Sequence, residues 1–380
     1  MRVAILTQPL GHNYGGLLQA YALQKAVMAN GCEVITIDRR PLEKNVSFLE
    51  NSEAFVKNLA RLFLGRIKNM PSRRKASFVL ENLREFKSRN ILMSIEITEH
   101  EELVKYFASH QFDLLIVGSD QVWRPKYSPK LENYFFDFYE AIDLNAKRIS
   151  YAASFGVDKW EFSKIQTSEC KVLLNQFDAV TVREDSAVEL CSTHFGVEAV
   201  KVVDPTLLFD SCFYQSLMPE HDQLGARGKV LNYILDPAED KQAIAGRVSQ
   251  LLNKENLSIK PDSYLHVGPS KLKECQYPSV ELWLQSFFLC DFVVTDSFHG
   301  CVFAIIFNKP FVAVGNLNRG MARFESLLSM FDLKDRLLES LDDVTEDIVS
   351  AKIDWAEVEA KRLTLAEAGN AFLKQHITKD

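Results

Sequence analysis

The chain has 380 residues, a length that exceeds one ordinary domain and predicts two. Hydrophobic residues make up 47% and charged residues 25%, which is the composition of a folded globular protein and excludes a disordered one. The formal net charge of -7 argues against a nucleic-acid-binding protein, because such proteins usually present a basic face.

The chain begins with a strand–helix–strand pattern. Residues 3–7 predict a short buried strand, and residues 17–29 predict a helix that stops at Gly31. Residues 33–37 predict the next strand, and the glycine-bearing stretch 12–16 is expected to be a loop between the first strand and the helix. A βαβ unit of this kind implies a parallel sheet with helices on its faces.

A basic segment at about residues 50–92 interrupts this rhythm. Basic residues mixed with apolar ones are typical of a helix at a membrane surface or at an anionic acceptor. They are equally typical of a solvated helical insertion, so peripheral membrane contact and plain solvation both stay open. The basic residues are Lys57, Arg61, Arg66, Lys68, Arg73, Arg74, Lys75, Arg84, Lys87 and Arg89.

Strand patterns then resume in two series. The first comprises residues 113–117, 148–152, 179–182 and 199–203, and the second comprises residues 230–235, 263–267, 291–295 and 311–314, with helical patterns at 239–252, 280–288, 299–307 and 320–330. Residues 210–228 lack a strand pattern and read as a connection. We therefore predict an α/β fold with two Rossmann-like, doubly wound domains facing a cleft, as in the GT-B architecture. Their predicted bounds are 1–210 and 225–345, followed by C-terminal helices in 346–380.

The stretch 294–300 runs from a predicted strand into a predicted helix. The first turn of a helix leaves backbone N–H groups unpaired, and so favours an anion such as phosphate or carboxylate. Ser297 fits the N-cap position, and Gly300 lies within the first turn. His299 at this turn suits proton donation to a bound phosphate, or else it is a structural histidine satisfied by a backbone carbonyl.

Six stretches, taken in chain order, resemble the polysaccharide pyruvyl transferase family over most of residues 1–325. They are Asn13-Tyr14-Gly15-Gly16 with Gln19-Ala20-Tyr21-Ala22-Leu23-Gln24, Gly118-Ser119-Asp120-Gln121-Val122-Trp123, Ala153-Ser154-Phe155-Gly156, Val182-Arg183-Glu184, Asp204-Pro205-Thr206-Leu207-Leu208 and Thr295-Asp296-Ser297-Phe298-His299-Gly300. The resemblance implies phosphoenolpyruvate as donor and co-substrate, with no other cofactor. It also implies a GT-B-like fold and a product in which pyruvate bridges two hydroxyls of one sugar as a ketal.

This chain departs from the family at one donor-binding position. Members often carry Arg-x-His where this chain has Ser297-Phe298-His299, so an arginine expected to hold the donor is missing. Phosphoenolpyruvate carries a carboxylate and a phosphate, which bidentate arginines bind best. Arg183 matches the family's arginine and is the predicted donor clamp, unless it forms an ordinary surface pair with Glu184 or Asp185. Arg319 and Arg323 are candidates to replace the missing arginine.

Ketal formation needs general acid and base groups, because an enol carbon gains a proton and two hydroxyls lose theirs. His299 is the candidate acid. Asp120 and Asp296 each follow a predicted strand and are candidate bases, with capping of the next helix as the alternative role.

The acceptor side of the cleft is expected around the first glycine-bearing loop, because glycine lets a backbone approach a ligand closely. No G-x-G-x-x-G or Walker-type pattern accompanies it, and the histidines lack metal-ligand spacing, so no metal is implied. The predicted acceptor-binding residues are Asn13, Tyr14, Gly15, Gln19 and Ser119.

Three functional hypotheses remain at this point. The leading one is pyruvyl transfer to a cell-surface polysaccharide precursor, with a small-molecule donor and a saccharide acceptor that is lipid-linked in one version. The second keeps the fold and uses a nucleotide-sugar donor, for which Glu274 and Glu281 are available carboxylates without a recognised pattern. The third is a non-catalytic sugar-binding protein. The longest apolar stretch, 301–314, is broken by Asn308-Lys309-Pro310, and no signal-peptide pattern opens the chain, so we expect a cytoplasmic protein, working at the inner face of the membrane if the acceptor is lipid-linked.

Overall fold

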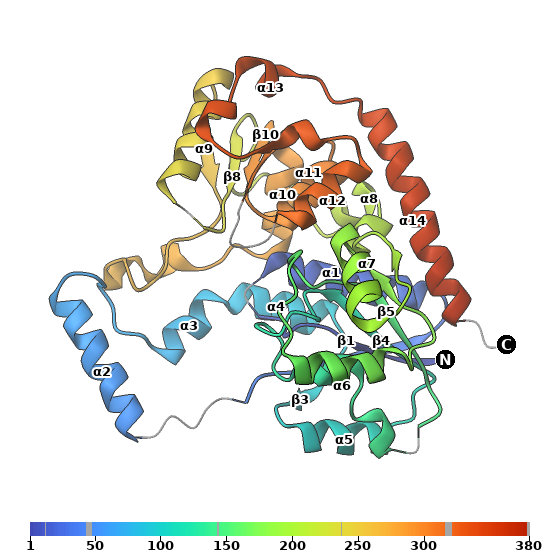
Figure 1. Cartoon of the computed structure of the whole chain (residues 1–380). Coiled ribbons are helices and arrows are strands. Elements are labelled where there is room, and N and C mark those ends of the chain that lie inside the picture. Colours follow the sequence, from blue (N-terminus) through green and yellow to red (C-terminus); the bar gives the residue numbers. More distant parts are fainter. Residues whose placement is uncertain (12, 43–47, 143, 237, 316–320, 378–380) are drawn as a thin grey trace.

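The computed structural model describes residues 1–11, 13–42, 48–142, 144–236, 238–315 and 321–377, with the backbone alone for 48–55 and 269. Two parallel sheets, each covered by helices, form two lobes, and this confirms the predicted α/β class (Figure 1).

The first lobe is built on a seven-stranded sheet in the order β3-β2-β1-β4-β5-β6-β7. Its central strands are apolar on both faces, because helices cover both sides of a parallel sheet. Val3 to Leu6 of β1, for example, are all buried. The strands are β1 (Arg2–Leu6), β2 (Glu33–Arg39), β3 (Met93–Ile97), β4 (Leu114–Asp120), β5 (Lys147–Ala153), β6 (Thr181–Val182) and β7 (Val200–Lys201).

Helices α1 (Tyr14–Ala29), α5 (His100–Ser109), α6 (Lys164–Leu174) and α7 (Asp185–Leu190) belong to this lobe. Helix α1 begins three residues earlier than the sequence predicted. Asn13 is its N-cap and accepts a hydrogen bond from the Gly15 backbone N–H at 3.0 Å, so the expected glycine loop is in fact the first helical turn.

The second lobe has a five-stranded sheet in the order β12-β11-β10-β8-β9. Its strands are β8 (Val230–Tyr233), β9 (Asn256–Ser258), β10 (Phe292–Thr295), β11 (Phe311–Val314) and β12 (Leu337–Leu338). Its longer helices are α9 (Glu239–Leu252), α10 (Val280–Leu289), α11 (Phe298–Ile306) and α12 (Ala322–Met330).

The strand predicted at residues 263–267 is wrong. The edge strand is β9, and residues 263–267 form turns instead. The Leu265 carbonyl accepts hydrogen bonds from the backbone N–H groups of Lys68 and Asn69, at 2.6 and 3.2 Å. This segment therefore bonds to the basic insertion of the first lobe rather than to a sheet.

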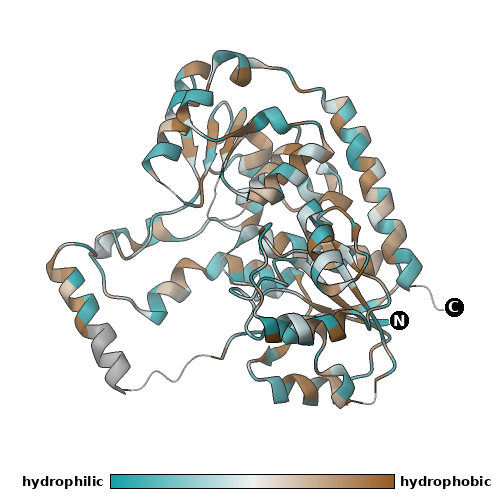
Figure 2. Ribbon diagram, in the orientation of Figure 1, coloured by the Kyte–Doolittle hydropathy of each residue, from teal (hydrophilic) through white to brown (hydrophobic). Residues whose placement is uncertain are grey.

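The insertion is helical, as predicted, with α2 (Phe48–Phe63), α3 (Arg73–Val79) and α4 (Glu81–Asn90). Helix α2 projects away from both lobes, and its described part carries both hydrophobic and hydrophilic residues (Figures 1 and 2). Within the described residues, none of the helices has the length and apolar character needed to cross a membrane.

The chain returns to the first lobe through α13 (Glu346–Ser350) and the long helix α14 (Trp355–Ile377), which runs along one side of the molecule (Figure 1). Arg362 of α14 donates hydrogen bonds to the carbonyls of Leu207 and Phe209, at 3.1 and 3.3 Å. Leu373 and Ile377 are buried at its end. The predicted C-terminal helices are present, and α14 packs against the first lobe.

Candidate active site

Four polar side chains from the two lobes meet where strands of both sheets end. Asp120 closes β4, Arg183 follows β6, and Asp204 follows β7. His299 lies in the first turn of α11, directly after β10 of the second lobe. Carboxyl ends of parallel strands are where open sheets bind ligands, so the topology itself assembles this cluster.

Asp204 is the centre of the cluster. Its Oδ2 lies 2.9 Å from Arg183 Nη1 and 3.5 Å from His299 Nε2, and its Oδ1 accepts hydrogen bonds from the backbone N–H and hydroxyl of Thr206. Burial by itself raises the pKa of Asp204, but His299, Arg183 and Thr206 together hold that pKa well below its usual range. Asp204 lies in one of the six family-like motifs, Asp204-Pro205-Thr206-Leu207-Leu208, but was not among the predicted site residues. A carboxylate directly after a predicted strand was the available signal.

Arg183 is 1% exposed, so the expected alternative pair with Glu184 exists but is buried and is not an ordinary surface ion pair. Besides Asp204 it has Asp120 Oδ1 at 3.8 Å from Nη2 and Glu184 Oε2 at 3.9 Å from Nε. Within the described part of the chain, Arg183 Nε and Nη2 have no hydrogen-bond acceptor. Buried donors without acceptors cost free energy, and an anion between the lobes would supply the missing acceptors.

Arg323 of α12 brings a second guanidinium to the same place. The Arg183 guanidinium lies 4.4 Å and the Arg323 guanidinium 5.9 Å from the centre of the Phe298 ring. Burial, and then the neighbouring charge of Arg183, lower the pKa of Arg323 to about 10. Two buried like charges so close together favour a bound anion. Arg319 lies outside the described residues.

His299 is 6% exposed and packs against the first turn of α1. A Cβ on Gly15 would lie 2.0 Å from His299 Nδ1, so only glycine allows the ring this position. Among the described residues, His299 Nε2 has no hydrogen-bond partner, and the carbonyl-satisfied alternative is therefore not observed. The Nε2 atom lies 3.5 Å from Asp204 Oδ2, the same oxygen that pairs with Arg183 Nη1.

The turn that holds His299 is shaped by its neighbours. Ser297 caps α11 as predicted, and its hydroxyl accepts a hydrogen bond from the Gly300 backbone N–H at 3.3 Å. A Cβ on Gly300 would lie 2.2 Å from Thr295 Oγ1, so glycine is required there for close packing. Both Ser297 and Gly300 are buried beside His299.

Asp296 does not fit the predicted role of a general base. It is 1% exposed, and it accepts hydrogen bonds from the backbone N–H groups of Leu235 and Asp236 and from Lys241 Nζ at 2.8 Å. The alternative role, capping the next helix, belongs to Ser297. The Asp296 carboxylate instead fixes the turn after β8, with a buried lysine as counter-ion.

Two of the predicted acceptor-binding residues are also corrected. Gln19 is fully buried, and its amide nitrogen donates to Thr7 Oγ1 and the Gly16 carbonyl, both at 3.1 Å, which braces α1 against the end of β1; its Oε1 has no hydrogen-bond partner among the described residues. Tyr14 is 1% exposed, stacks on Trp283 of α10, and donates its hydroxyl to the Pro278 carbonyl at 2.7 Å. Tyr14 therefore joins the two lobes.

The remaining predicted residues lie near the cluster. Ser119 is buried and its hydroxyl lies 3.4 Å from Asp204 Oδ2. Asp120 is partly exposed and has a φ of 73°, in the left-handed region that non-glycine residues rarely occupy. A Cβ on Gly16 would lie 3.8 Å from Asp120 Oδ2, so this carboxylate faces the first turn of α1. Asn13 is exposed at the start of that turn.

Across the described ranges, no group of three or more His, Cys, Asp or Glu side chains is arranged to hold a metal ion. With Arg323 and Glu184 added to the first four side chains, the cluster has two arginines, one histidine and three carboxylates, which are Arg183, Arg323, His299, Asp120, Glu184 and Asp204. Such a set can bind a small polyanion and move protons.

Comparisons with known proteins agree with this geometry. A family model described as polysaccharide pyruvyl transferase matches residues 13–318. Among solved structures, a Listeria monocytogenes protein described as a UDP-N-acetylglucosamine 2-epimerase is 11% identical, with a TM-score of 0.53 over 98% of this chain and 93% of its own. A glycosyltransferase from Rickettsia africae is 10% identical, with a TM-score of 0.51 over 99% of this chain and 94% of its own. These similarities show the two-lobed GT-B fold. Among curated proteins, none matches the chain.

Proposed function

Because the chain belongs to the polysaccharide pyruvyl transferase family, we propose that the cluster around Arg183 and His299 binds phosphoenolpyruvate and transfers its pyruvyl group to two hydroxyls of one sugar. The acceptor is proposed to be a cell-surface polysaccharide precursor, modified in the cytoplasm or at the inner face of the membrane. The description of the family covers pyruvyl transfer to a polysaccharide. The identity of the donor and the ketal form of the product are part of our proposal.

The observation that carries the proposal is the set of buried donors without acceptors. Arg183 Nε and Nη2 and His299 Nε2 are all buried without hydrogen-bond partners among the described residues. Arg323 adds a second cation whose pKa is lowered, chiefly by burial and next by Arg183. A trianion such as phosphoenolpyruvate satisfies these donors and separates the two positive charges. In this arrangement Arg323 takes the place of the arginine that Ser297 replaces.

The proposed reaction begins with protonation of C3 of the enol by His299. The resulting cation at C2 is captured by one sugar hydroxyl, and a second hydroxyl then displaces phosphate. The products are a pyruvate ketal and inorganic phosphate, and each positioned acid or base contributes roughly 10²–10⁴-fold. Of the two protons lost by the hydroxyls, one replaces the proton that His299 gave to C3, and the other leaves on the phosphate as HPO4²⁻.

Asp120 is the carboxylate suited to accept a hydroxyl proton. It is the partly exposed member of the three carboxylates, whereas Asp204 and Glu184 are each 1% exposed. Asp204 has Arg183, His299 and Thr206 as partners and therefore orients the acid and the donor clamp. We assign it a positioning role.

A nucleotide-sugar glycosyltransferase is the second candidate, because the fold is shared with a glycosyltransferase. Glu274 and Glu281, the carboxylates available for a ribose, do not support it. Glu274 is exposed and pairs with Lys271 at 3.7 Å, and Glu281 lies in the first turn of α10.

The test is thermal unfolding with phosphoenolpyruvate, UDP and GDP in parallel. At a concentration ~100 times its dissociation constant, a ligand stabilises the folded protein by about 2.7 kcal/mol. We expect phosphoenolpyruvate to stabilise the wild type and to lose this effect in Arg183→Gln. Phosphate release from phosphoenolpyruvate with saccharide acceptors is expected to vanish in His299→Ala. Stabilisation by the nucleotides alone would replace this proposal with the glycosyltransferase.

A further inference from the structure

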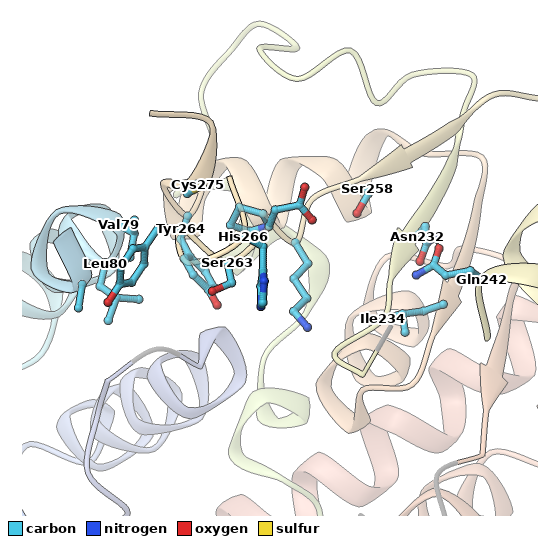
Figure 3. A pocket seen from close by; sticks show the side chains of 15 residues that line it. Val79, Leu80, Asn232, Ile234, Gln242, Ser258, Ser263, Tyr264, His266 and Cys275 are labelled. Atoms are coloured by element: carbon cyan, nitrogen blue, oxygen red, sulfur yellow. Dashed lines mark hydrogen bonds between the residues drawn. The ribbon is translucent and has the colours of Figure 1, made fainter. Parts of the chain in front are cut away.

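A cavity of about 730 Å³ lies at the carboxyl ends of β8 and β9, outside the Arg183–His299 cluster (Figure 3). One wall comes from these strands and α9 of the second lobe, and the other from α3 and the start of α4 in the insertion of the first lobe. Its volume falls in the range of small-molecule sites. None of the predicted site residues lines it.

Part of the cavity lining is apolar and aromatic. Val79, Leu80 and Ile234 line it together with the rings of Tyr264 and Tyr277. Tyrosine rings offer a flat apolar surface with a polar tip. This surface matches the C–H face of a pyranose ring.

The rest of the lining is polar and close to neutral in charge, with Asn232, Gln242 and Ser258 at one end and Ser263 beside Tyr264 (Figure 3). Asn232 donates to Gln242 Oε1 at 3.2 Å, which leaves the Gln242 amide N–H groups and the hydroxyls of Ser258 and Ser263 along the rim. Side-chain amides and hydroxyls both donate and accept, as sugar hydroxyls do. The charged side chains of the lining, Lys260 and Asp262, carry opposite charges.

This charge balance argues against a nucleoside diphosphate. A diphosphate needs several cations or a helix N-terminus without nearby carboxylates. Helix α9, which contributes Gln242, carries Glu239 and Asp240 in its first turn. These two carboxylates oppose the binding of phosphate at that end.

The cavity and the reaction site share one edge of one sheet. In the second sheet β10, which leads to His299, lies beside β8, and β8 lies beside β9. Tyr277 of the cavity wall contacts Tyr14, at 6.1 Å between ring centres, and Tyr14 precedes the glycine that touches His299. The cavity wall is thus linked to His299 through Tyr277, Tyr14 and Gly15, and a sugar chain longer than one unit could extend from the cavity toward the donor site.

The walls are held together by hydrogen bonds between the lobes. Asn69 donates to the carbonyls of Tyr264 and Val267, at 2.9 and 2.6 Å, and Asn82 donates to the Tyr277 carbonyl at 2.7 Å. The Tyr277 backbone N–H donates to the Val79 carbonyl at 2.9 Å. The insertion is thus part of the cavity and not a separate appendage.

From these contacts we propose that the cavity is the acceptor subsite and binds a neutral sugar unit of the saccharide. The assignment rests on the proposed pyruvyl transfer. It moves acceptor recognition from the first turn of α1, where Tyr14 and Gln19 are buried, to the second lobe and the insertion.

The test fills the cavity without touching the donor site. Ser258 is exposed on the edge strand β9 and lines the cavity, so Ser258→Trp blocks it; Ser350→Trp, at an exposed position that ends α13, is the matched control. Ligand-observed NMR uses methyl glycosides of glucose, galactose and N-acetylmannosamine as probes. We expect saturation transfer to at least one glycoside with the wild type and Ser350→Trp, and none with Ser258→Trp.

The milder variant Gln242→Ala keeps the test valid if the tryptophan disturbs folding. We expect it to raise the acceptor KM roughly tenfold or more while leaving the KM for phosphoenolpyruvate unchanged. Equal glycoside binding by wild type and Ser258→Trp, no glycoside binding at all, or competition by UDP overturns the acceptor assignment. Failure of phosphoenolpyruvate to stabilise the wild type is a separate outcome and removes the proposed function itself.

Discussion

Gly15 of α1 and His299 of α11 touch across the boundary between the lobes, with no room for even one methyl group between them. A Cβ on Gly15 would lie 2.0 Å from Nδ1 and 2.3 Å from Cγ of the imidazole. The neighbouring Gly16 has ordinary space, because a Cβ there would meet no atom closer than 3.7 Å. The two glycines therefore separate a steric effect on His299 from an effect on the helix.

We expect Gly15→Ala to displace His299 and to reduce activity on the order of 100-fold, because misplacing a reacting group by about 1 Å costs that much. Overpacking is expected to lower the free energy of unfolding by about 1–3 kcal/mol. Gly16→Ala should keep activity and gain slightly in stability from helix propensity. Phosphate-release rates and urea denaturation of both variants measure this, and equal activities would contradict the assigned role of His299.

Asp120 and Asp296 have opposite expected phenotypes. Asp120→Asn removes the proposed base and should lower kcat on the order of 10²–10⁴-fold with little change in melting temperature. Asp296→Asn removes the buried counter-ion of Lys241, which keeps only the half-exposed Asp236 at 3.4 Å, and should lower the free energy of unfolding by about 3 kcal/mol. The folded fraction of that variant is expected to keep its activity per molecule. The reverse pattern would restore Asp296 as the base.

Asp204 is expected to make the free energy of unfolding fall at acid pH. Its pKa is lower in the folded protein than in the unfolded chain, so its contribution is fully present above the unfolded value of about 3.9 and is lost as pH falls toward the folded pKa. Asp204→Asn should therefore lower the free energy of unfolding by about 3 kcal/mol at pH 7. The difference in free energy of unfolding from the wild type should shrink below about pH 4. Guanidinium unfolding at a series of pH values measures it, and a constant difference would refute the coupling.

We expect helix α2 to bind to an anionic membrane surface. Phe63 is 84% and Val56 62% exposed, and Lys57 and Arg61 lie on the same helix. We expect co-sedimentation with vesicles containing phosphatidylglycerol and little with phosphatidylcholine alone, since apolar insertion and cationic attraction act together. Phe63→Asp should abolish it. Ile165→Asp, at a 71% exposed position on α6, is the control, and equal loss in both variants would rule α2 out.

Strong local patterns allowed much of the fold to be predicted. The predicted bounds of α9 and β11 agree with the structure to the residue. The start of α1 was misplaced because glycines such as Gly15 and Gly16 usually mark loops, whereas here both are helical and Gly15 lets α1 pack closely at the lobe boundary. Strand β3 went unpredicted, and residues 263–267 bond to the insertion, a long-range pairing that no local pattern reveals.

The candidate site was less predictable, because burial is a tertiary property. Arg183, His299 and Arg323 were named from their positions, and the structure brings them together. Asp204, the residue that two of them share, had no local signal beyond a carboxylate after a strand. Asp296 had the same signal and serves Lys241 instead, so the sequence alone does not separate the two.

The hydrogen bonds from Asn69 and Asn82 to the 264–277 segment have a consequence for motion. Two-lobed proteins commonly admit and release ligands by hinge rotation of one lobe against the other. Here the insertion joins the lobes on one flank and α14 joins them elsewhere, so a wide swing has to break the bonds that wall the cavity. Opening and closing of the lobes is therefore expected to depend on the proposed acceptor cavity. Departure of the acceptor should loosen the contacts that hold the two lobes together.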